Sequence, residues 1–287
     1  MLPDPPFTVI DVGAAGSLLS LGLLDPACEI HGFEPRPDGV PRSYPGYASV
    51  HIHNFGLAGT SGTHTLYLTR EPMASSLLRP NPDVAKRYYR ADTLDVVAET
   101  TIECKTLDEL AKAKLIPDRI DYLKLDTQGS EYDILRGGHH LLRQTSIITC
   151  ETEFVQLYEN QPLFADVAGH LASEGFRFID FISGESIRGK RIWADALFAR
   201  IPTDAAHAIR MAKILAALGQ VAEARWILRE HDISPAMTDQ ICALAPKRGL
   251  IHALRAINHQ RLMDGKLYYN GRRVRQILRG LWLVSRP

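Results

Sequence analysis

Acidic side chains stand at the ends of two apolar segments of this 287-residue chain, where they could accept a proton or orient a polar ligand. Asp126 follows the segment 120–125, and Glu151 and Glu153 follow the segment 146–150. Both segments are short and apolar, which predicts buried strands. Ligands of open α/β sheets bind at the carboxyl ends of strands. We therefore predict catalytic roles for Asp126, Glu151 and Glu153, with the two glutamates on one face because they are two residues apart.

The acidic residues also have other interpretations, which the sequence leaves open. Asp126 could contact a cofactor, or cap the helix expected to open at Ser130. Glu131 could form a polar wall of the site or favour the dipole of that helix, and the two glutamates could be solvated at a rim. Lys124 is expected to be an inward ion-pair partner, and Tyr158 to lie in a loop that covers the acceptor. Nothing in the sequence fixes the distances between these acids, so we assign no metal ion.

A glycine-containing turn marks a second candidate site. The strand predicted over 7–11 enters Asp11-Val-Gly-Ala-Ala-Gly-Ser17, and helical spacing follows over 17–24. Gly13 and Gly16 would let the backbone approach a ligand closely, and Gly16 could supply a positive φ. Such a turn also fits a plain strand-to-helix connection, so it indicates a cofactor only together with other residues.

Glu34 supplies that context, 18 residues after Gly16. It ends a second predicted strand, 28–34, where a carboxylate can accept hydrogen bonds from both hydroxyls of a ribose. The arrangement would also suit NAD, but the turn lacks the Gly-x-Gly-x-x-Gly spacing that favours a pyrophosphate. S-adenosylmethionine contains a ribose and no phosphate, so the pattern favours it as the cofactor.

The order of the predicted elements indicates a doubly wound, Rossmann-like α/β fold. Strands are expected over 7–11, 28–34, 49–54, 64–68, 101–105, 120–125, 146–150, 176–180 and 194–199. Helices from Leu107, from Ser130 and near 164–173 alternate with them, which predicts a mostly parallel sheet with helices on both faces. The segment 70–100 contains three prolines and is predicted to be an irregular lid or substrate loop.

Only helical patterns follow Pro202, over 204–218, 221–231, 250–263 and 272–284. We therefore divide the chain into an α/β domain, residues 1–202, and a helical domain, residues 203–287. The first two helices resemble one tetratricopeptide-type hairpin, which cannot bury its own apolar face alone. It is expected to pack on the α/β domain or on a second subunit.

Short motifs occur along the chain in the order Asp11-Val-Gly-Ala14, Phe33-Glu-Pro35, Asn54-Phe-Gly-Leu-Ala58, Ser75-Ser-Leu77, Thr106-Leu-Asp-Glu-Leu110, Lys124-Leu-Asp-Thr-Gln-Gly-Ser-Glu131 and Ile134-Leu-Arg-Gly137. This order resembles the FkbM family of S-adenosylmethionine-dependent methyltransferases, over roughly residues 7–200. The resemblance implies O-methylation, often of sugar or polyketide hydroxyls. The residues that we assign to the cofactor are Asp11, Gly13, Ala14, Gly16, Phe33, Glu34, Asn54 and Phe55. Those that we assign to the substrate are Ser75, Ser76, Glu131 and Tyr158.

The sequence departs from the family pattern at Ala15, where many members carry asparagine. Loss of that side-chain contact would weaken cofactor binding, and it keeps an alternative function open. In that alternative, a catalytically decayed Rossmann-like scaffold docks to a membrane or protein through its helical tail. The intact Glu34 and the complete motif 124–131 favour an enzyme. We expect an O-methyltransferase that acts on a hydroxyl of a sugar, glycan or glycolipid precursor, in polysaccharide biosynthesis.

Charge is unevenly distributed along the chain. Residues 247–287 contain ten Lys or Arg and one acid, a net +9, so residues 1–246 carry −9. Within this tail, residues 272–284 combine apolar helical spacing with arginines on the other faces. Such a basic amphipathic helix could lie on an anionic membrane or pack on the acidic body.

Four widely spaced cysteines, the absence of a signal-peptide pattern and the absence of a long apolar run predict a cytoplasmic protein. Peripheral contact with the inner face of a membrane through residues 272–284 and a homo-oligomer are further expectations. A small-molecule or glycan acceptor is expected, and nucleic acid is not, because no nucleic-acid-binding motif occurs.

Overall fold

The computed structural model describes residues 5–15, 19–36, 39, 46–88 and 92–246. The chain divides into two compact units, residues 1–245 and 246–287, and nearly all of the described residues belong to the first. Gly16 and the helices predicted over 250–263 and 272–284 lie outside the described residues. Among the described helices, none combines the length and the apolar character that crossing a membrane requires.

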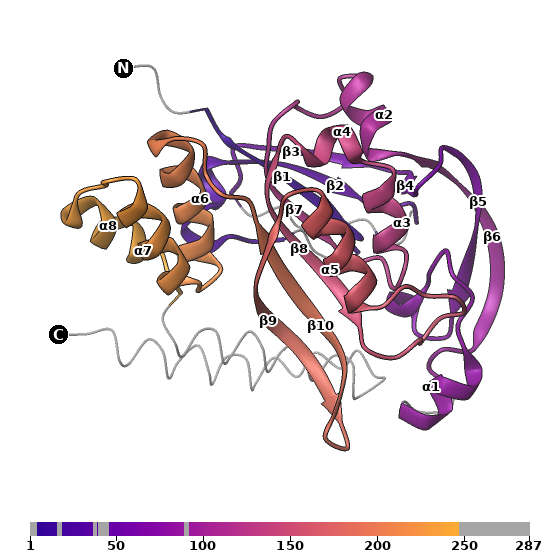
Figure 1. The fold of residues 1–287 in the computed structure, drawn as a ribbon. Coiled ribbons are helices and arrows are strands. Elements are labelled where there is room, and N and C mark those ends of the chain that lie inside the picture. Colours follow the sequence, from indigo (N-terminus) through magenta and orange to yellow (C-terminus); the bar gives the residue numbers. More distant parts are fainter. Residues whose placement is uncertain (1–4, 16–18, 37–38, 40–45, 89–91, 247–287) are drawn as a thin grey trace, which may run out of the picture. The chain divides into compact units, whose positions relative to one another are not determined.

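A seven-stranded sheet organises the first unit, in the order β3-β2-β1-β7-β8-β10-β9 (Figure 1). Its strands are β1 (Phe7–Val12), β2 (Cys28–Phe33), β3 (Ser49–His53), β7 (Ile120–Leu125), β8 (Thr145–Glu153), β9 (Arg177–Ile187) and β10 (Lys190–Ala199). The first five strands in this order are parallel, and β10 is antiparallel to both β8 and β9. The predicted mostly parallel, doubly wound sheet is confirmed. The strand order reverses at β1, which has β2 on one side and β7 on the other. Folds of this kind bind ligands where the strand order reverses.

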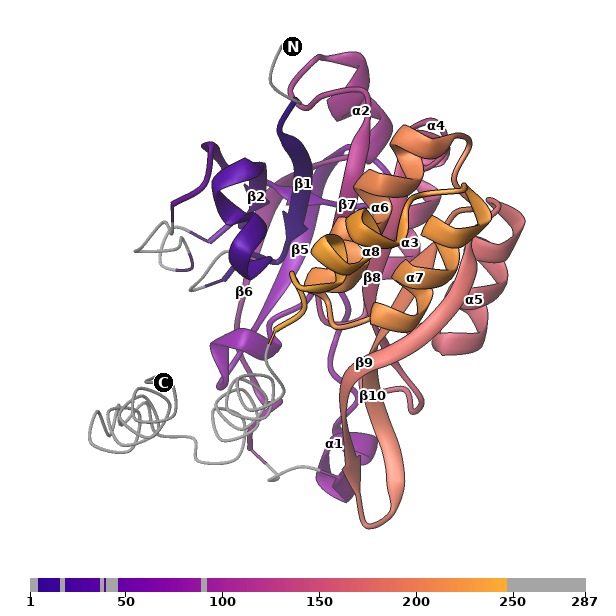
Figure 2. The ribbon, with the colours of Figure 1, turned by 90° about the vertical axis from the view of Figure 1, so that its left-hand side faces the viewer.

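Helices cover both faces of this sheet (Figures 1 and 2). One face carries the 3-10 helix η1 (Gly22–Ala27) and the helices α6 (Ala205–Ala217), α7 (Val221–Glu230) and α8 (Pro235–Cys242). The other face carries α2 (Leu107–Lys112), α3 (Glu131–Arg136), α4 (His139–Leu142) and α5 (Phe164–Ser173). Because side chains alternate along a strand, Val9 and Tyr122 pack with α6–α8, whereas Ile10 and Leu123 pack with α2–α5.

A smaller sheet, β4-β6-β5, lies in the chain between β3 and α2. Its strands are β4 (Gly56–Leu57), β5 (Gly62–Thr69) and β6 (Val96–Lys105), and the short helices η2 (Pro72–Ala74) and α1 (Pro82–Tyr88) join β5 to β6. The prediction of an irregular segment over 70–100 was therefore wrong in part. Residues 97–101 of β6 are all exposed. This strand therefore has no alternation of buried apolar and exposed polar side chains there, which is the pattern that indicates a strand in a sequence.

The helix predicted over 17–24 is wrong for its described part. Residues 19–21 are not helical, and η1 follows them. The Asp25 carboxylate holds this connection, because it accepts hydrogen bonds from the Ser20 hydroxyl and the Leu21 amide, both at 2.6 Å. Gly22 has a φ of +64°, and Pro26 lies within the turn; neither feature suits an α-helix.

The helices after Pro202 share a core with the sheet. Met211 and Leu215 of α6 are buried in one cluster with Val9 and Tyr122, so the hairpin packs on the sheet of its own chain. The helices predicted over 204–218 and 221–231 are confirmed, whereas the mostly exposed α8 was not predicted. The domain boundary at residue 202 stays a prediction.

A buried ion pair joins α6 to the sheet. Nε and Nη2 of Arg210 donate to the two oxygens of Asp121 at 2.9 and 2.7 Å. Asp121 also accepts from the Thr8 amide at 2.9 Å, and the guanidinium lies over the Phe7 ring. The side chains of Arg210 and Asp121 are 14% and 3% exposed, so this charge-assisted, two-point contact is shielded from water.

Replacing Arg210 by alanine is expected to lower the free energy of unfolding by about 3 kcal/mol, because Asp121 would remain buried without this partner. Urea denaturation measures the change. The matched control is Asp118→Asn, which breaks an ion pair whose side chains are 65% and 70% exposed and should change stability by less than about 0.5 kcal/mol. Equal effects of the two substitutions would contradict the role of Arg210.

Candidate functional site

Gly13 brings the end of β1 against the end of β7. Its φ is +81°, and a Cβ at this position would lie 1.9 Å from the carbonyl oxygen of Asp126. The amides of Gly13 and Ala14 donate to the carbonyl oxygen of Phe33 at 3.1 and 3.2 Å. The turn is therefore held to β2 and β7 together. A positive φ was predicted for Gly16, which lies outside the described residues; the structure shows one at Gly13.

Lys124 links two carboxylates at the ends of neighbouring strands. Its Nζ lies 3.4 Å from Oδ1 of Asp11 and 3.2 Å from Oδ2 of Asp126, so the predicted ion-pair role is confirmed. The other oxygen of Asp11 accepts the Leu19 amide at 2.7 Å and so holds the far end of the glycine turn. Burial opposes the charge of Lys124, but Asp126, Asp11 and Asp195 outweigh it and hold the pKa of Lys124 well above its ordinary value.

Acidic side chains gather near the carboxyl ends of β7 and β8. This carboxylate cluster consists of Asp126, Glu131, Glu151, Glu153 and Asp195. The Gln128 amide joins two of its members, because Nε2 donates to Asp126 at 3.1 Å and to Glu151 at 2.7 Å. Asp195 lies directly opposite Glu151 in the antiparallel pairing of β10 with β8. The structure thus brings Asp126 and Glu151 together at the predicted edge of the sheet.

Glu131 shapes the turn between β7 and α3. Its carboxylate accepts the Thr127 amide at 2.5 Å, the Thr127 hydroxyl at 3.0 Å and the Gly129 amide at 2.9 Å. Ser130 occupies the N-cap position of α3, and its side chain makes no capping hydrogen bond. The capping role considered for Asp126 is therefore not observed, and the Asp126 side chain is directed to Lys124 and Gln128 instead.

Burial makes ionisation of the three glutamates in the carboxylate cluster unfavourable. It raises the pKa of Glu131 to about 7, against the opposing effect of the backbone hydrogen bonds. The pKa values of Glu151 and Glu153 are raised well above 4.5 by burial first, and then chiefly by the charges of Asp126 and Glu131 respectively. Glu151 and Glu153 are 9% and 2% exposed, so the interpretation that they are solvated at a rim is wrong.

Glu34 is buried at the end of β2, where Arg36 binds it. Its Oε1 accepts hydrogen bonds from the Arg36 amide at 2.9 Å and from the Arg36 Nε at 3.1 Å. The same guanidinium donates to the carbonyl oxygen of Pro72 at 2.8 Å. Arg36 thereby joins the predicted ribose-binding carboxylate to η2, and a ribose would share this carboxylate with Arg36.

The aromatic residues assigned to the cofactor form one stack beside Glu34. The Phe33 ring is parallel to that of His53, with centroids 4.5 Å apart, and meets Phe55 edge-on at 5.7 Å. Phe33 is buried and Phe55 half-buried, whereas Asn54 between His53 and Phe55 is exposed. The structure places these residues near the end of β2 without assigning them a ligand.

Ser76 and Tyr158, which we assigned to the substrate, hold Gln128 in place. The Ser76 hydroxyl donates to the Gln128 carbonyl oxygen at 2.7 Å, and the Tyr158 hydroxyl approaches the Gln128 side-chain oxygen at 3.3 Å. Tyr158 also donates to the carbonyl oxygen of Ala74 at 2.9 Å, and so links η2 to the carboxylate cluster. The Ser75 hydroxyl instead accepts from the backbone of β5.

Sequence reasoning did not single out Gln128 or Asp195. Gln128 lies inside the motif 124–131, and its φ of +61° at a strand-to-helix turn is unusual for a residue other than glycine. That motif was therefore the available signal. Asp195 stands in an apolar strand, and only the antiparallel pairing of β10 with β8 places it beside the site.

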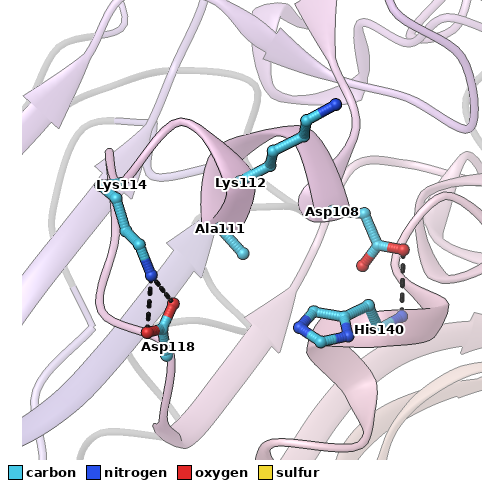
Figure 3. Close-up of a pocket in the computed structure, with 6 residues that line it drawn as sticks. All are labelled: Asp108, Ala111, Lys112, Lys114, Asp118 and His140. Carbon is cyan, nitrogen blue, oxygen red and sulfur yellow. Dashed lines mark hydrogen bonds and ion pairs between the residues drawn. The ribbon is translucent and has the colours of Figure 1, made fainter.

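A separate cavity of about 360 Å³ lies beside α2 and α4, and its lining residues are Asp108, Ala111, Lys112, Lys114, Asp118 and His140 (Figure 3). These elements precede β7 and β8 in the chain, so the cavity lies near the amino ends of the strands. It is therefore distinct from the carboxylate cluster and from the glycine turn, and we do not assign the cofactor to it.

The fold and the site together define a Rossmann-like α/β protein with a glycine turn after β1, an acid after β2 and carboxylates after β7. The chain belongs to the FkbM methyltransferase family, because the model of the methyltransferase FkbM domain matches residues 11–178. It is a methyltransferase that depends on S-adenosylmethionine, as the sequence resemblance implied. No curated relative matches the sequence.

Solved structures with some similarity are also methyltransferases. A magnesium protoporphyrin IX methyltransferase from Synechocystis PCC 6803, with S-adenosylmethionine bound, is 13% identical over 68% of this chain and 71% of its own, with a TM-score of 0.38. An FkbM methyltransferase from Methylobacillus flagellatus KT is 12% identical over 68% and 44%, with a TM-score of 0.39. These likenesses are weak, so the family rests on the domain match and the fold on the strand order.

The substitution Gly13→Ala is expected to abolish cofactor binding and to destabilise the fold by about 3 kcal/mol or more, because the methyl group would collide with the backbone of Asp126 in addition to straining φ. The matched control is Gly189→Ala. Gly189 has a φ of +77° but nothing within 4 Å of its Cβ position, so strain alone should cost about 1–2 kcal/mol. Calorimetric titration with S-adenosylhomocysteine and urea denaturation measure both effects; similar results for the two variants would contradict the close approach.

The free energy of unfolding is expected to fall as the pH rises from about 4.5 to about 7. Over this range unfolded Glu131 has lost its proton, whereas folded Glu131 keeps it because its pKa is about 7. Folding therefore becomes less favourable with rising pH, by on the order of 3 kcal/mol for this group. Glu131→Gln should flatten this slope in urea denaturations at several pH values. An unchanged slope would show that Glu131 does not titrate in this range.

Proposed function

We propose that this protein transfers a methyl group from S-adenosylmethionine to a hydroxyl of a sugar, glycan or glycolipid precursor. One observation carries this proposal: Gln128 holds Asp126 and Glu151 together at the carboxyl ends of β7 and β8. A carboxylate with a raised pKa is a suitable base for a hydroxyl at neutral pH, and the pKa of Glu151 is raised by burial.

The residues present fit this cofactor. S-adenosylmethionine carries positive charge on its ammonium and sulfonium groups, and acids outnumber the neighbouring Lys124 in the carboxylate cluster. Glu34 would bind the ribose hydroxyls through its carboxylate, as the family pattern implies. The half-buried Phe55, which packs edge-on against Phe33, offers apolar ring surface near Glu34, which suits an adenine.

When bound, the cofactor supplies an electrophilic methyl group, which an acceptor oxygen attacks from the side opposite the sulfur. The task of the protein is to hold that oxygen in line and to take up its proton. We assign the proton to Glu151, with Asp126 contacting the cofactor or sharing this role through Gln128. Glu153, on the same face of β8, would orient a further hydroxyl of the acceptor.

A sugar is the acceptor class that best suits these side chains. Ionised carboxylates accept hydrogen bonds, and protonated ones also donate, so Glu151 and Glu153, whose pKa values are raised, can do both toward several hydroxyls. Ser76 and Tyr158 connect the cluster to the segment around η2, which supports the assignment of these two residues to the acceptor side. Membrane contact through residues 272–284 remains a separate proposal.

Glu151→Gln is expected to lower kcat by about 100-fold or more, since loss of a general base typically costs that much, and to leave affinity for S-adenosylhomocysteine unchanged. Release of S-adenosylhomocysteine is measured with monosaccharides, nucleotide sugars and lipid-linked glycans, beside amine and carboxylate acceptors. The methylated product is identified by NMR.

Glu159→Gln is the matched control, because Glu159 is exposed and lies in the loop that follows the same strand. It should retain the wild-type rate. Methylation of nitrogen or of a carboxylate would contradict transfer to a hydroxyl. Cofactor binding without transfer to any acceptor would favour the scaffold function.

A further inference from the structure

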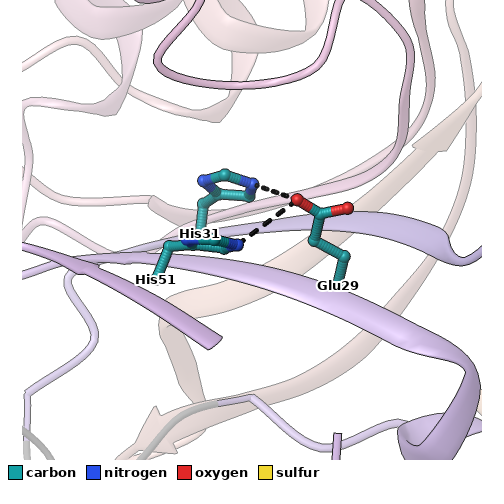
Figure 4. Close-up of side chains that lie close together, drawn as sticks. All are labelled: Glu29, His31 and His51. Carbon is teal, nitrogen blue, oxygen red and sulfur yellow. Dashed lines mark hydrogen bonds and ion pairs between the residues drawn. The ribbon is translucent and has the colours of Figure 1, made fainter. Parts of the chain in front are cut away.

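Histidines and an acid converge on the outer strands of the main sheet, away from the carboxylate cluster. Glu29 and His31 are two residues apart on β2 and so share one face, and His51 lies directly opposite His31 on the edge strand β3. Figure 4 shows both imidazole rings turned toward the Glu29 carboxylate. None of these residues takes part in the proposed methyl transfer.

The distances within this group match those between the ligands of one metal ion. The Nε2 atoms of His31 and His51 lie 3.2 and 3.4 Å from the same oxygen, Oε1 of Glu29. Zinc bonds of about 2.0–2.2 Å in a tetrahedral arrangement separate neighbouring ligand atoms by roughly 3.3–3.5 Å. All of the ligand atoms lie within 4.8 Å of one another, so modest side-chain rotation would bring the third pair to this spacing.

His53 supplies the outer contact that a metal-binding histidine usually has. The Nδ1 of His31 lies 3.3 Å from the Nε2 of His53, which leaves the Nε2 of His31 directed at Glu29. The His53 ring is itself packed against Phe33. His31 is therefore fixed on both sides, with a side chain only 4% exposed, whereas His51 is 47% exposed. Water has access to the group from that side.

We propose that Glu29, His31 and His51 bind a divalent transition-metal ion of the zinc type, with His53 orienting His31 and water completing the coordination. Two imidazoles and one carboxylate are an established ligand set for zinc. Bound metal would join β2 to β3, which among the described strands pairs only with β2. It would thereby brace the strand whose end carries Phe33 and Glu34.

Zinc binding by the full-length protein tests this proposal. The protein is freed of metal with EDTA, given ZnCl2, desalted and analysed for bound zinc, and its Tm is measured with and without the metal. One zinc ion per chain and a higher Tm are expected. His51→Ala and Glu29→Gln should each weaken zinc binding at least 10-fold. His53→Ala should weaken it by about 10–100-fold, as expected for an outer contact.

His140→Ala is the matched control, because His140 is an exposed histidine on α4 and its loss should leave zinc binding unchanged. His51 is also half-exposed, so His51→Ala should keep the Tm of the metal-free wild type; if it does not, His51→Gln is used instead. Absence of bound zinc, or zinc binding that survives both His51→Ala and Glu29→Gln, would overturn the proposal. Titration with S-adenosylhomocysteine measures cofactor binding and not zinc binding, so it keeps this result distinct from the test of methyl transfer.

Discussion

The ion pairs of Lys124 with Asp11 and Asp126 are the interaction on which the site depends. Carboxylates removed from water cost several kcal/mol each unless a cation or hydrogen-bond donors accompany them. Lys124 of β7 does this for two strands at once, because its Nζ contacts Asp11 of β1 and Asp126 at the end of β7. Asp11, so neutralised, holds the Leu19 amide and with it the far end of the glycine turn. The glycine turn and the carboxylate cluster are thus parts of one electrostatic arrangement.

Chemistry and stability make opposite demands on the carboxylate cluster. Glu151 and Glu153 would be more stable if they were ionised in water, but burial raises their pKa values, as the proposed proton transfer from a hydroxyl requires. Gln128 offsets part of the cost of burying these acids, because its side-chain amide donates hydrogen bonds to both Asp126 and Glu151. Its own position depends on Ser76 and Tyr158, which come from segments on either side of α2–α4 in the chain. The excursion between β5 and β6 is therefore structurally part of the site.

The rest of the fold positions these groups from a distance. The pair Arg210–Asp121 holds α6 on the face that carries Val9 and Tyr122, and α2–α5 close the opposite face. A metal ion on β2 and β3 would brace the outer part of the same sheet.

The sequence by itself determined the fold class, the glycine turn, the positions of most sheet strands and the family, because apolar periodicity and short motifs are local properties. It placed Asp126 and Glu151 at one edge, since parallel strands align their carboxyl ends. Only the tertiary structure decided that Asp195 faces Glu151, that Arg36 binds Glu34 and that η1 replaces a helix. These features depend on antiparallel pairing, on side-chain hydrogen bonds and on Asp25, none of which leaves a periodic signal. The grouping of Glu29, His31 and His51 likewise arises from strand register, which brings together residues that are separate in the chain.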